Sequence, residues 1–222
     1  MKICVIIPTL NEEKAIGGLI REIKKIALDV LVVDDGSHDK TSQIAKSEGA
    51  HVISNNINLG KGIALRQGFK YATHNNYDAV ITMDGDGQHN PKDIQMLIDT
   101  GFNDNETGIV VGNRMFEVRN MPILRILTNR IMSNLISFVC RQNIPDSQCG
   151  FRLIKCSFIR KIDLSSKKYE IESEILIKSS RLKYKIKSIP IQTIYAGEKS
   201  QINPFIDTFR FIKFIIKEYF TK

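Results

Sequence analysis

The sequence predicts an α/β protein built on a Rossmann-like, mostly parallel sheet with helices on both faces. Short apolar runs alternate with helical segments through the first half of the chain, and these runs are apolar at consecutive rather than alternate positions. Consecutive apolar residues are typical of strands that are buried on both faces. Strands that alternate with helices indicate β-α-β units and an open sheet sandwiched by helices.

The predicted elements follow one another in a regular order up to residue 111. Strands are expected at 3–7, 30–33, 52–53, 79–83 and 109–111. Helices are expected at 12–27, where apolar residues recur every three or four positions, and at 40–48, 61–73 and 91–99. The second half is less regular, and its expected elements are helices at 121–140, about 171–182 and 204–219, and a strand at 186–191.

Composition indicates one folded domain with an uneven charge distribution. Of the 222 residues, 42% are hydrophobic and 25% charged, which excludes a disordered or fibrous chain. No internal repeat or low-complexity linker interrupts residues 1–222, so a single domain is expected. Residues 1–150 hold 16 basic and 17 acidic groups, whereas residues 151–222 hold 16 and 7. The excess positive charge predicts an anionic partner, either nucleic acid or a membrane surface.

Cysteines and hydropathy predict a cytoplasmic protein. The four cysteines form no C-x-x-C pair, which indicates buried free thiols and excludes a zinc site or disulfide framework. The chain starts directly with an apolar strand pattern instead of a signal peptide. No stretch approaches the roughly 18 apolar residues needed to cross a bilayer, so no transmembrane anchor is expected.

Acidic and small residues follow four of the predicted strands. In an open parallel sheet, the loops after the strands lie at one edge, where ligands bind. These loops read Pro8–Glu12, Asp34–Ser37, Asp84–Gln88 and Gly112–Arg114. The two carboxylates of Asp84-Gly85-Asp86 suit Mg²⁺ or Mn²⁺ held together with substrate phosphates, and Gln88 can add an oxygen. A solvated Asp-Gly turn is the alternative.

Of the neighbouring Asp34 and Asp35, one is expected to stabilise the local fold and the other to bind a ligand. Two acids after a buried strand are costly unless they find partners. One of them can support the turn at Ser37, and the other can accept hydrogen bonds from a nucleobase or ribose, as acids at strand ends do in nucleotide-binding α/β folds.

Several motifs together resemble the family 2 glycosyltransferases. The motifs are Pro8-Thr9-Leu10-Asn11-Glu12-Glu13, Val33-Asp34-Asp35-Gly36-Ser37, Asn58-Leu59-Gly60-Lys61-Gly62 and Met83-Asp84-Gly85-Asp86-Gly87-Gln88-His89. The dolichyl- and polyprenyl-phosphate mannose or glucose synthases are resembled more closely still. That likeness rests on Gly112-Asn113-Arg114, Asp146-Ser147-Gln148-Cys149-Gly150-Phe151-Arg152, Tyr169-Glu170-Ile171-Glu172-Ser173-Glu174 and Ser200-Gln201-Ile202-Asn203-Pro204.

The resemblance implies an A-type glycosyltransferase fold and a nucleotide-sugar donor. Residues 1–115 would form the nucleotide-sugar-binding half, and residues 116–222 the acceptor and membrane-facing half. The implied nucleotide-sugar site consists of Pro8, Leu10, Glu12, Val33, Asp35, Asp84, Gly85, Asp86, Arg152 and Lys199. The implied ligands of the metal, Mg²⁺ or Mn²⁺, are Asp84, Asp86 and Gln88.

Charge chemistry predicts the acceptor side of the site. A lipid phosphate is largely ionised at neutral pH, since its second pKa is near 6, and it needs cations rather than a strong base. Arg114, Arg130 and Asn134 are the candidates for holding it. Asp146 is a fallback base or a structural turn residue. Catalytic roles are thus expected for Asp86, Arg114, Arg130 and Asp146.

Other conspicuous residues receive a structural interpretation. The four histidines form no triad pattern and are expected in loops or at the surface. Lys61 lacks the P-loop spacing, so a turn at a helix start is expected there. The apolar stripe of residues 204–222, interspersed with lysines, predicts an amphipathic helix that either packs on the core or lies on anionic lipid. We favour the membrane surface, on its cytoplasmic side.

The leading hypothesis is metal-dependent transfer of a hexose from UDP-glucose or GDP-mannose to a polyprenyl or dolichyl phosphate. A glycosyltransferase acting on a glycan hydroxyl is the enzymatic alternative and would need a base such as Asp146. A sugar nucleotidyltransferase would show a Gly-rich basic loop in place of residues 8–13. A non-catalytic membrane scaffold is the alternative of a different class. Nucleic-acid binding ranks last, because no aromatic and basic recognition motif accompanies the charge.

Overall fold

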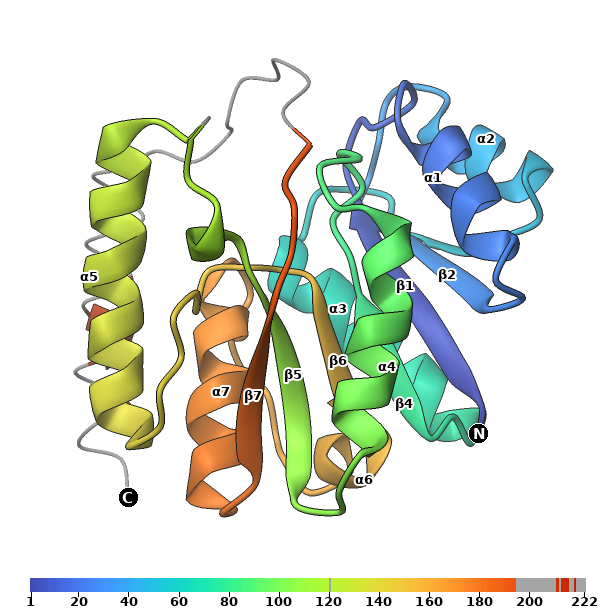
Figure 1. Cartoon of the computed structure of the whole chain (residues 1–222). Coiled ribbons are helices and arrows are strands. Elements are labelled where there is room, and N and C mark those ends of the chain that lie inside the picture. Colours follow the sequence, from blue (N-terminus) through green and yellow to red (C-terminus); the bar gives the residue numbers. More distant parts are fainter. Residues whose placement is uncertain (120, 195–210, 212, 216–217, 219–222) are drawn as a thin grey trace.

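The protein is organised around one seven-stranded sheet with the strand order β3-β2-β1-β4-β6-β5-β7 (Figure 1). The computed structural model describes residues 1–119, 121–194, 211, 213–215 and 218. The strands are β1 Ile3–Thr9, β2 Asp29–Asp34, β3 His51–Ser54, β4 Ala79–Thr82, β5 Thr107–Asn113, β6 Arg152–Lys155 and β7 Lys185–Pro190. Only β6 runs antiparallel to its neighbours, which confirms the predicted mostly parallel sheet.

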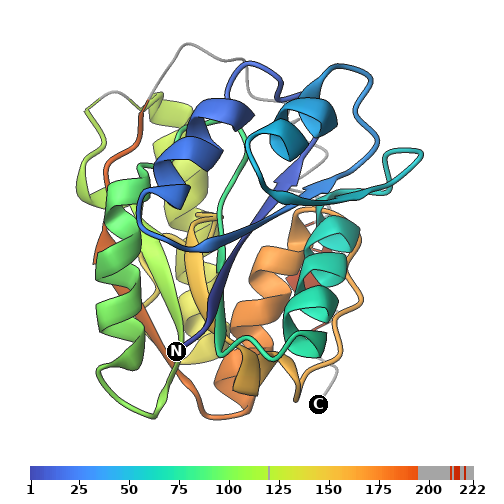
Figure 2. The same ribbon diagram turned by 90° about the vertical axis from the view of Figure 1, so that its right-hand side faces the viewer.

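Helices cover both faces of the sheet, as predicted. They are α1 Ile16–Lys24, α2 Thr41–Ser47, α3 Lys61–His74, α4 Ile94–Phe102, α5 Ile123–Cys140, α6 Cys156–Ile159 and α7 Glu170–Arg181, with 3-10 turns at Pro91–Asp93 and Arg114–Phe116. Figure 2 shows α1 and α4 on one side of the sheet and α3 and α7 on the other. α5 packs against α7 at the outside of the molecule.

The consecutive apolar runs form the buried strands of the core. Val5, Ile6 and Ile7 of β1 are fully buried, because helices cover both faces of this central strand. Burying each such isoleucine contributes about 1.5–3 kcal/mol. The four cysteines are free and buried, as predicted, and burial raises the pKa of Cys4 to about 12. This packed sheet gives the loops at its edges a rigid base.

The sequence reasoning missed β6, which it treated as the end of a loop. β6 has four residues and lies between β4 and β5, where Thr82 pairs with Arg152 and Val110 with Leu153. Its direction is opposite to that of both neighbours. The start of β6 therefore lies at the edge where β4 and β5 end.

The predicted terminal helix at 204–219 lies mostly outside the described residues. Those that are described are helical, and Phe211 and Ile215 are buried in the core. Glu218 forms an ion pair with Arg181 of α7, with 2.9 Å between Oε2 and Nη1. At these positions the segment packs on the protein, which is the alternative that the sequence reasoning did not favour.

α5 has an inverted distribution of polar and apolar side chains. Its inner face buries Asn129, Ser133, Ile136 and Cys140. Its outer face exposes Ile123, Leu124, Leu127, Ile131, Leu135 and Phe138. Among the described helices, α5 alone is long and apolar enough to cross a membrane by length and composition. α5 is not an uninterrupted apolar stretch, as the sequence analysis found, because its 18 residues include Arg125, Arg130 and several polar side chains.

Candidate active site

The carboxyl ends of β1 and β4 form the crevice where the site lies. The chain leaves β1 toward β2 and β3 on one side, while β4 lies on the other side of β1. Ligands of open α/β sheets bind at such a reversal of strand order. The two loops here touch, since a Cβ atom added to Gly85 would lie 2.7 Å from Cγ2 of Thr9. The predicted donor-site segments after β1 and β4 are thus brought together.

Loops after β1 and β2 are joined by hydrogen bonds. The backbone N–H of Asn11 donates to Oγ of Ser37 at 2.8 Å, and that of Glu12 donates to Oγ1 of Thr41 at 2.8 Å. Pro8 and Leu10 are half-buried in this region, and Val33 is fully buried at the end of β2. These contacts join the loop that carries Leu10 and Glu12 to the segment that follows β2, next to the buried Val33.

Asp35 organises the loop that begins α3. Its carboxylate accepts hydrogen bonds from the backbone N–H groups of Leu59 at 3.0 Å and Gly60 at 2.7 Å, and from Nδ2 of Asn55 at 2.9 Å. Asp34 accepts from the backbone N–H of Ser37 at 3.0 Å. Both acids therefore hold protein groups, and binding of a nucleobase or ribose by Asp35 stays a prediction.

Lys61, at the start of α3, links the acidic loop to the second half of the chain. Its Nζ lies 2.6 Å from Oδ1 of Asp84 and 2.7 Å from Oε1 of Glu172 on α7. The sequence reasoning predicted only a turn at a helix start for Lys61 and gave Glu172 no role. The Gly60-Lys61-Gly62 motif and the glutamates in the first turns of α7 were the available signals. Only the fold brings the two together.

Burial and charge set the protonation of this cluster. Burial opposes ionisation of Asp84, but the Lys61 ammonium and the contact with His89 outweigh it and hold the pKa of Asp84 below its ordinary value. Burial likewise opposes the charge on Lys61, and the carboxylates of Asp84 and Glu172 outweigh it and raise the Lys61 pKa. Asp84 and Lys61 are therefore both ionised at neutral pH.

His89 lies inside the protein beside Asp84. Its side chain is 3% exposed, its ring stacks on Phe151 at 5.2 Å between centroids, and its Nε2 lies 3.5 Å from Oδ2 of Asp84. Its buried Nδ1 has no hydrogen-bond partner among the described residues. His89 lies in the connection between β4 and the 3-10 turn at Pro91–Asp93, as the prediction of a loop position allows, but it is buried instead of exposed because it packs between the Phe151 ring and Asp84.

Asp84, Asp86 and Gln88 offer the oxygen donors that a hard divalent cation requires. Asp86 and Gln88 are half-buried, and Oδ1 of Asp86 accepts from the backbone N–H of Gln88 at 3.0 Å. Among the described residues, no three His, Cys, Asp or Glu side chains are grouped to hold a metal by themselves. This sparse set fits a metal whose remaining ligands are phosphate oxygens and water, as is usual for Mg²⁺.

Arg114 and Asp146 form a buried, bidentate ion pair. Nε and Nη2 of Arg114 lie 2.8 and 2.9 Å from the two carboxylate oxygens, and the backbone N–H of Arg114 donates to the same acid at 3.1 Å. Asp146 is fully buried. Burial opposes its ionisation, but the Arg114 charge keeps its pKa below the ordinary value. This pairing favours the structural interpretation of Asp146 over its use as a base.

Arg152 supports the site from inside the protein. Its side chain is 1% exposed, and its guanidinium donates to the backbone carbonyls of Cys149 at 2.7 Å, Glu172 at 2.6 Å and Ser147 at 2.8 Å. A contact with a diphosphate would require these bonds to break. In the structure Arg152 holds the 147–149 loop against α7, and its binding to the nucleotide sugar stays a prediction.

The remaining candidate residues, two for the acceptor and one for the nucleotide sugar, lie on α5 or beyond the described residues. Arg130 and Asn134 are exposed on α5. This helix is fixed to the loop after Asp146, because the Ser147 backbone N–H donates to Oγ of Ser133 at 2.9 Å. Lys199 lies outside the described residues. The structure thus brings α5 next to the Arg114–Asp146 pair. Among the described residues, Arg130 forms no ion pair.

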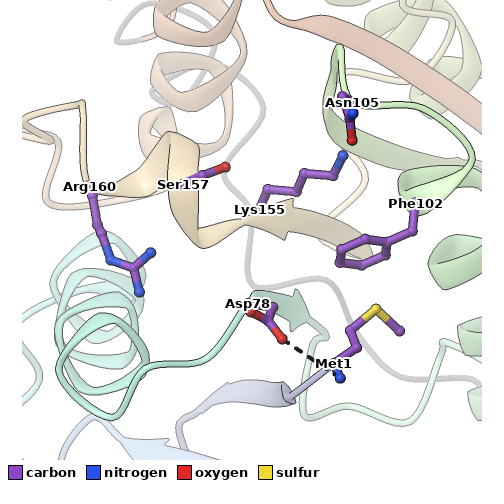
Figure 3. A pocket seen from close by; sticks show the side chains of 7 residues that line it. All are labelled: Met1, Asp78, Phe102, Asn105, Lys155, Ser157 and Arg160. Atoms are coloured by element: carbon purple, nitrogen blue, oxygen red, sulfur yellow. Dashed lines mark ion pairs between the residues drawn. The ribbon is translucent and has the colours of Figure 1, made fainter.

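A separate cavity of about 410 Å³ lies at the opposite end of the sheet (Figure 3). Met1 and Asp78 precede β1 and β4, and Lys155 ends the antiparallel β6, so all three mark the amino ends of the parallel strands. The lining residues are Met1, Asp78, Phe102, Asn105, Lys155, Ser157 and Arg160. None is a predicted site residue, so this cavity is distinct from the candidate active site.

The fold and the acidic crevice define the class of nucleotide-binding α/β enzymes that use a metal-suited carboxylate pair. A family model described as glycosyl transferase family 2 matches residues 4–163. This chain therefore belongs to glycosyl transferase family 2, as its motifs predicted.

Two curated relatives extend the likeness over most of the chain. A Methanocaldococcus jannaschii protein of uncharacterized function is 38% identical over 87% of this chain and 82% of its own length. The UDP-N-acetylglucosamine–dolichyl-phosphate N-acetylglucosaminyltransferase of Methanococcus voltae is 34% identical over 87% of this chain and 86% of its own length.

A solved structure confirms the A-type glycosyltransferase fold. Glucosyl-3-phosphoglycerate synthase from Mycobacterium tuberculosis, in complex with Mn²⁺, UDP and phosphoglyceric acid, aligns with a TM-score of 0.80 at 19% identity. The alignment covers 100% of this chain and 79% of that protein.

Proposed function

We propose that this glycosyltransferase transfers a hexose from a nucleotide sugar to a polyprenyl or dolichyl phosphate. The carrying observation is the Asp84-Gly85-Asp86 loop in the β1–β4 crevice, beside the half-buried Lys61. The relative from Methanococcus voltae, which is named for a dolichyl-phosphate acceptor, supports the lipid phosphate. The name of that relative also gives UDP-N-acetylglucosamine as a donor, which becomes a third candidate donor for this chain beside UDP-glucose and GDP-mannose.

The acceptor supplies its own nucleophile. A phosphate monoester is largely dianionic at neutral pH, so one of its oxygens attacks the anomeric carbon without giving up a proton. The bond from that carbon to the diphosphate breaks, and the nucleoside diphosphate leaves with the electron pair. This reaction needs no general base, which agrees with the ion pair that Asp146, the candidate base, forms with Arg114.

Residues of the chain position the donor and the acceptor. We assign the nucleoside to the rim of Pro8, Leu10, Glu12, Val33 and Asp35. A divalent ion, Mg²⁺ or Mn²⁺, would be held by Asp84, Asp86 and Gln88 and would stabilise negative charge on the leaving diphosphate. Arg130 and Asn134 would hold the acceptor phosphate, with Arg114 behind them.

A hydroxyl acceptor is the second candidate, and a non-catalytic scaffold the third. A hydroxyl must lose a proton, and Asp146 is fully buried in its ion pair. The intact carboxylate loop does not favour a scaffold. The membrane surface on the cytoplasmic side follows as the place of the reaction, because the acceptor is a lipid.

The test is a matrix of donors, acceptors and metals. UDP-glucose, UDP-N-acetylglucosamine and GDP-mannose are each incubated with a short-chain polyprenyl phosphate or the corresponding polyprenol, with Mn²⁺, Mg²⁺ or EDTA. We expect transfer only to the phosphate and only with metal. Transfer to the alcohol, or full activity in EDTA, would contradict the proposal.

A thermal-shift measurement tests metal binding separately from catalysis. UDP with Mn²⁺ should raise the melting temperature of the wild type, and Asp86→Asn should remove the Mn²⁺-dependent part of that shift. Asp99→Asn on the exposed side of α4 is the matched control, since Asp99 lies outside the crevice.

A further inference from the structure

The outer face of α5 is a continuous exposed apolar surface. Ile123, Leu124, Leu127, Ile131, Leu135 and Phe138, here called the outer stripe, recur at intervals of one to four residues along the helix. They are 84%, 64%, 55%, 51%, 40% and 72% exposed, respectively. Large contiguous apolar surfaces of this kind mark binding sites.

The inner face of the same helix is the more polar one. Asn129 and Ser133 are buried there, and Ser133 is bonded to Ser147. A helix at the surface of a soluble protein normally buries its apolar side and exposes its polar side. α5 buries Ile136 and Cys140 as expected, but it also buries two polar side chains and exposes six large apolar ones, so its sequence fits an apolar partner outside the protein.

We propose that the outer stripe docks α5 onto the surface of an anionic lipid bilayer. Charge complementarity favours lipid: residues 123–140 contain Arg125 and Arg130 and no Asp or Glu. Arginines beside an exposed apolar stripe are typical of helices that lie in the headgroup region. The docking goes beyond the proposed sugar transfer, which names the acceptor but not the surface that meets the membrane.

A second copy of the chain fits this surface less well. The centre of the outer stripe lies near Arg130 and Ile131, so a symmetric pair through it would bring two copies of Arg130 together. The helix has no carboxylate to compensate that repulsion. Anionic headgroups do compensate it.

α5 lies on the bilayer rather than crossing it. The helix packs along α7, and Ser133 is bonded to the loop beside the buried Arg114–Asp146 pair. A spanning helix would have to leave these contacts and expose Asn129 and Ser133 to hydrocarbon, where polar groups without partners are costly. One apolar face suffices for binding in the interface.

The test is co-sedimentation with vesicles in the absence of any substrate. We compare vesicles of phosphatidylcholine with vesicles that also contain phosphatidylglycerol, using the wild type and the double variant Leu127→Gln/Ile131→Gln. The control is Ile26→Gln, because Ile26 is 46% exposed and follows α1, which Figure 1 shows on the opposite side of the molecule from α5. Circular dichroism and melting temperature verify that each variant folds.

We expect the wild type and Ile26→Gln to bind anionic vesicles and to be released by alkaline carbonate. The double variant should bind at least about tenfold more weakly, since two apolar anchors are lost. Unchanged binding by the double variant would overturn the proposal. Retention of the wild type on vesicles after carbonate would overturn docking in favour of a membrane-spanning helix. If the wild type were a dimer and the double variant a monomer, the outer stripe would instead be the contact with a second copy.

Activity assays keep this proposal apart from the proposed reaction. If both hold, the double variant loses transfer to a long-chain acceptor in vesicles and keeps transfer to a short-chain phosphate in solution. If the wild type binds vesicles but transfers to neither acceptor, the reaction is wrong and the docking stands.

Discussion

Replacing Lys61 with methionine tests whether the central ion cluster is an energetic link between the two halves of the protein. The ammonium lies 2.6 Å from Asp84 and 2.7 Å from Glu172, and the three side chains are 19%, 29% and 9% exposed. Lys61→Met keeps most of the apolar stem but leaves two carboxylates without a cation. Breaking a buried pair in this way costs about 3–5 kcal/mol.

We expect a loss of about 3 kcal/mol in the free energy of unfolding, at the lower end of that range, because Lys61 keeps partial contact with water. Urea unfolding with linear extrapolation measures it. The double variant Lys61→Met/Glu172→Gln should recover about 1–2 kcal/mol, since one uncompensated charge is removed and neighbouring substitutions are not additive.

The control is Lys25→Met, which removes an exposed ion pair with Glu22 on α1. Exposed pairs contribute little to stability, so no measurable change is expected. If Lys61→Met were as stable as this control, or if the double variant were less stable than the single one, the inferred coupling between Asp84, Lys61 and Glu172 would be refuted.

Three further results are expected. Lowering the pH below about 4 should destabilise the wild type more steeply than Lys61→Met in acid-unfolding curves, because unfolded Asp84 is protonated near its ordinary pKa while the folded carboxyl stays ionised beside Lys61. Asp35→Asn should cost about 1–3 kcal/mol in urea unfolding and weaken UDP binding in calorimetry, because the loop that begins α3 loses charged acceptors for its N–H groups. Gly150→Ala, whose Cβ would lie 2.7 Å from Oδ2 of Asp84, should reduce the Mn²⁺-dependent thermal shift with UDP, whereas Gly18→Ala, with open space around it, should not.

The parallel part of the fold was predictable because its strands bury both faces. Runs such as Ile3–Ile7 are apolar at every position, which is a local signal that needs no knowledge of neighbours. β6 gave no such signal: two apolar residues, Leu153 and Ile154, stand between Arg152 and Lys155. Only the pairing with β4 and β5 makes this segment a strand.

In the candidate site, too, some residues were predictable from the sequence and others were not. The carboxylates after β4 were predictable from position, since strand ends meet at one edge. The partners of Lys61 were not, because Asp84 and Glu172 are 88 residues apart in the sequence and meet only through packing of α3 and α7. For Arg152, a basic residue in a site motif predicted ligand binding, but the fold engages its guanidinium with backbone carbonyls.

The reversed direction of β6 determines which insertions the enzyme can tolerate. Because β6 starts at the active edge, the segment between α5 and β6 enters the site and carries Asp146, Ser147 and Gly150 with it. Added length there would change the proposed acceptor side directly. The connections from α4 to β5 and from α7 to β7 turn at the far edge, so chain length can vary there without reaching the chemistry. We therefore expect insertions at residues 141–151, more than elsewhere, to alter the acceptor that an enzyme of this architecture uses.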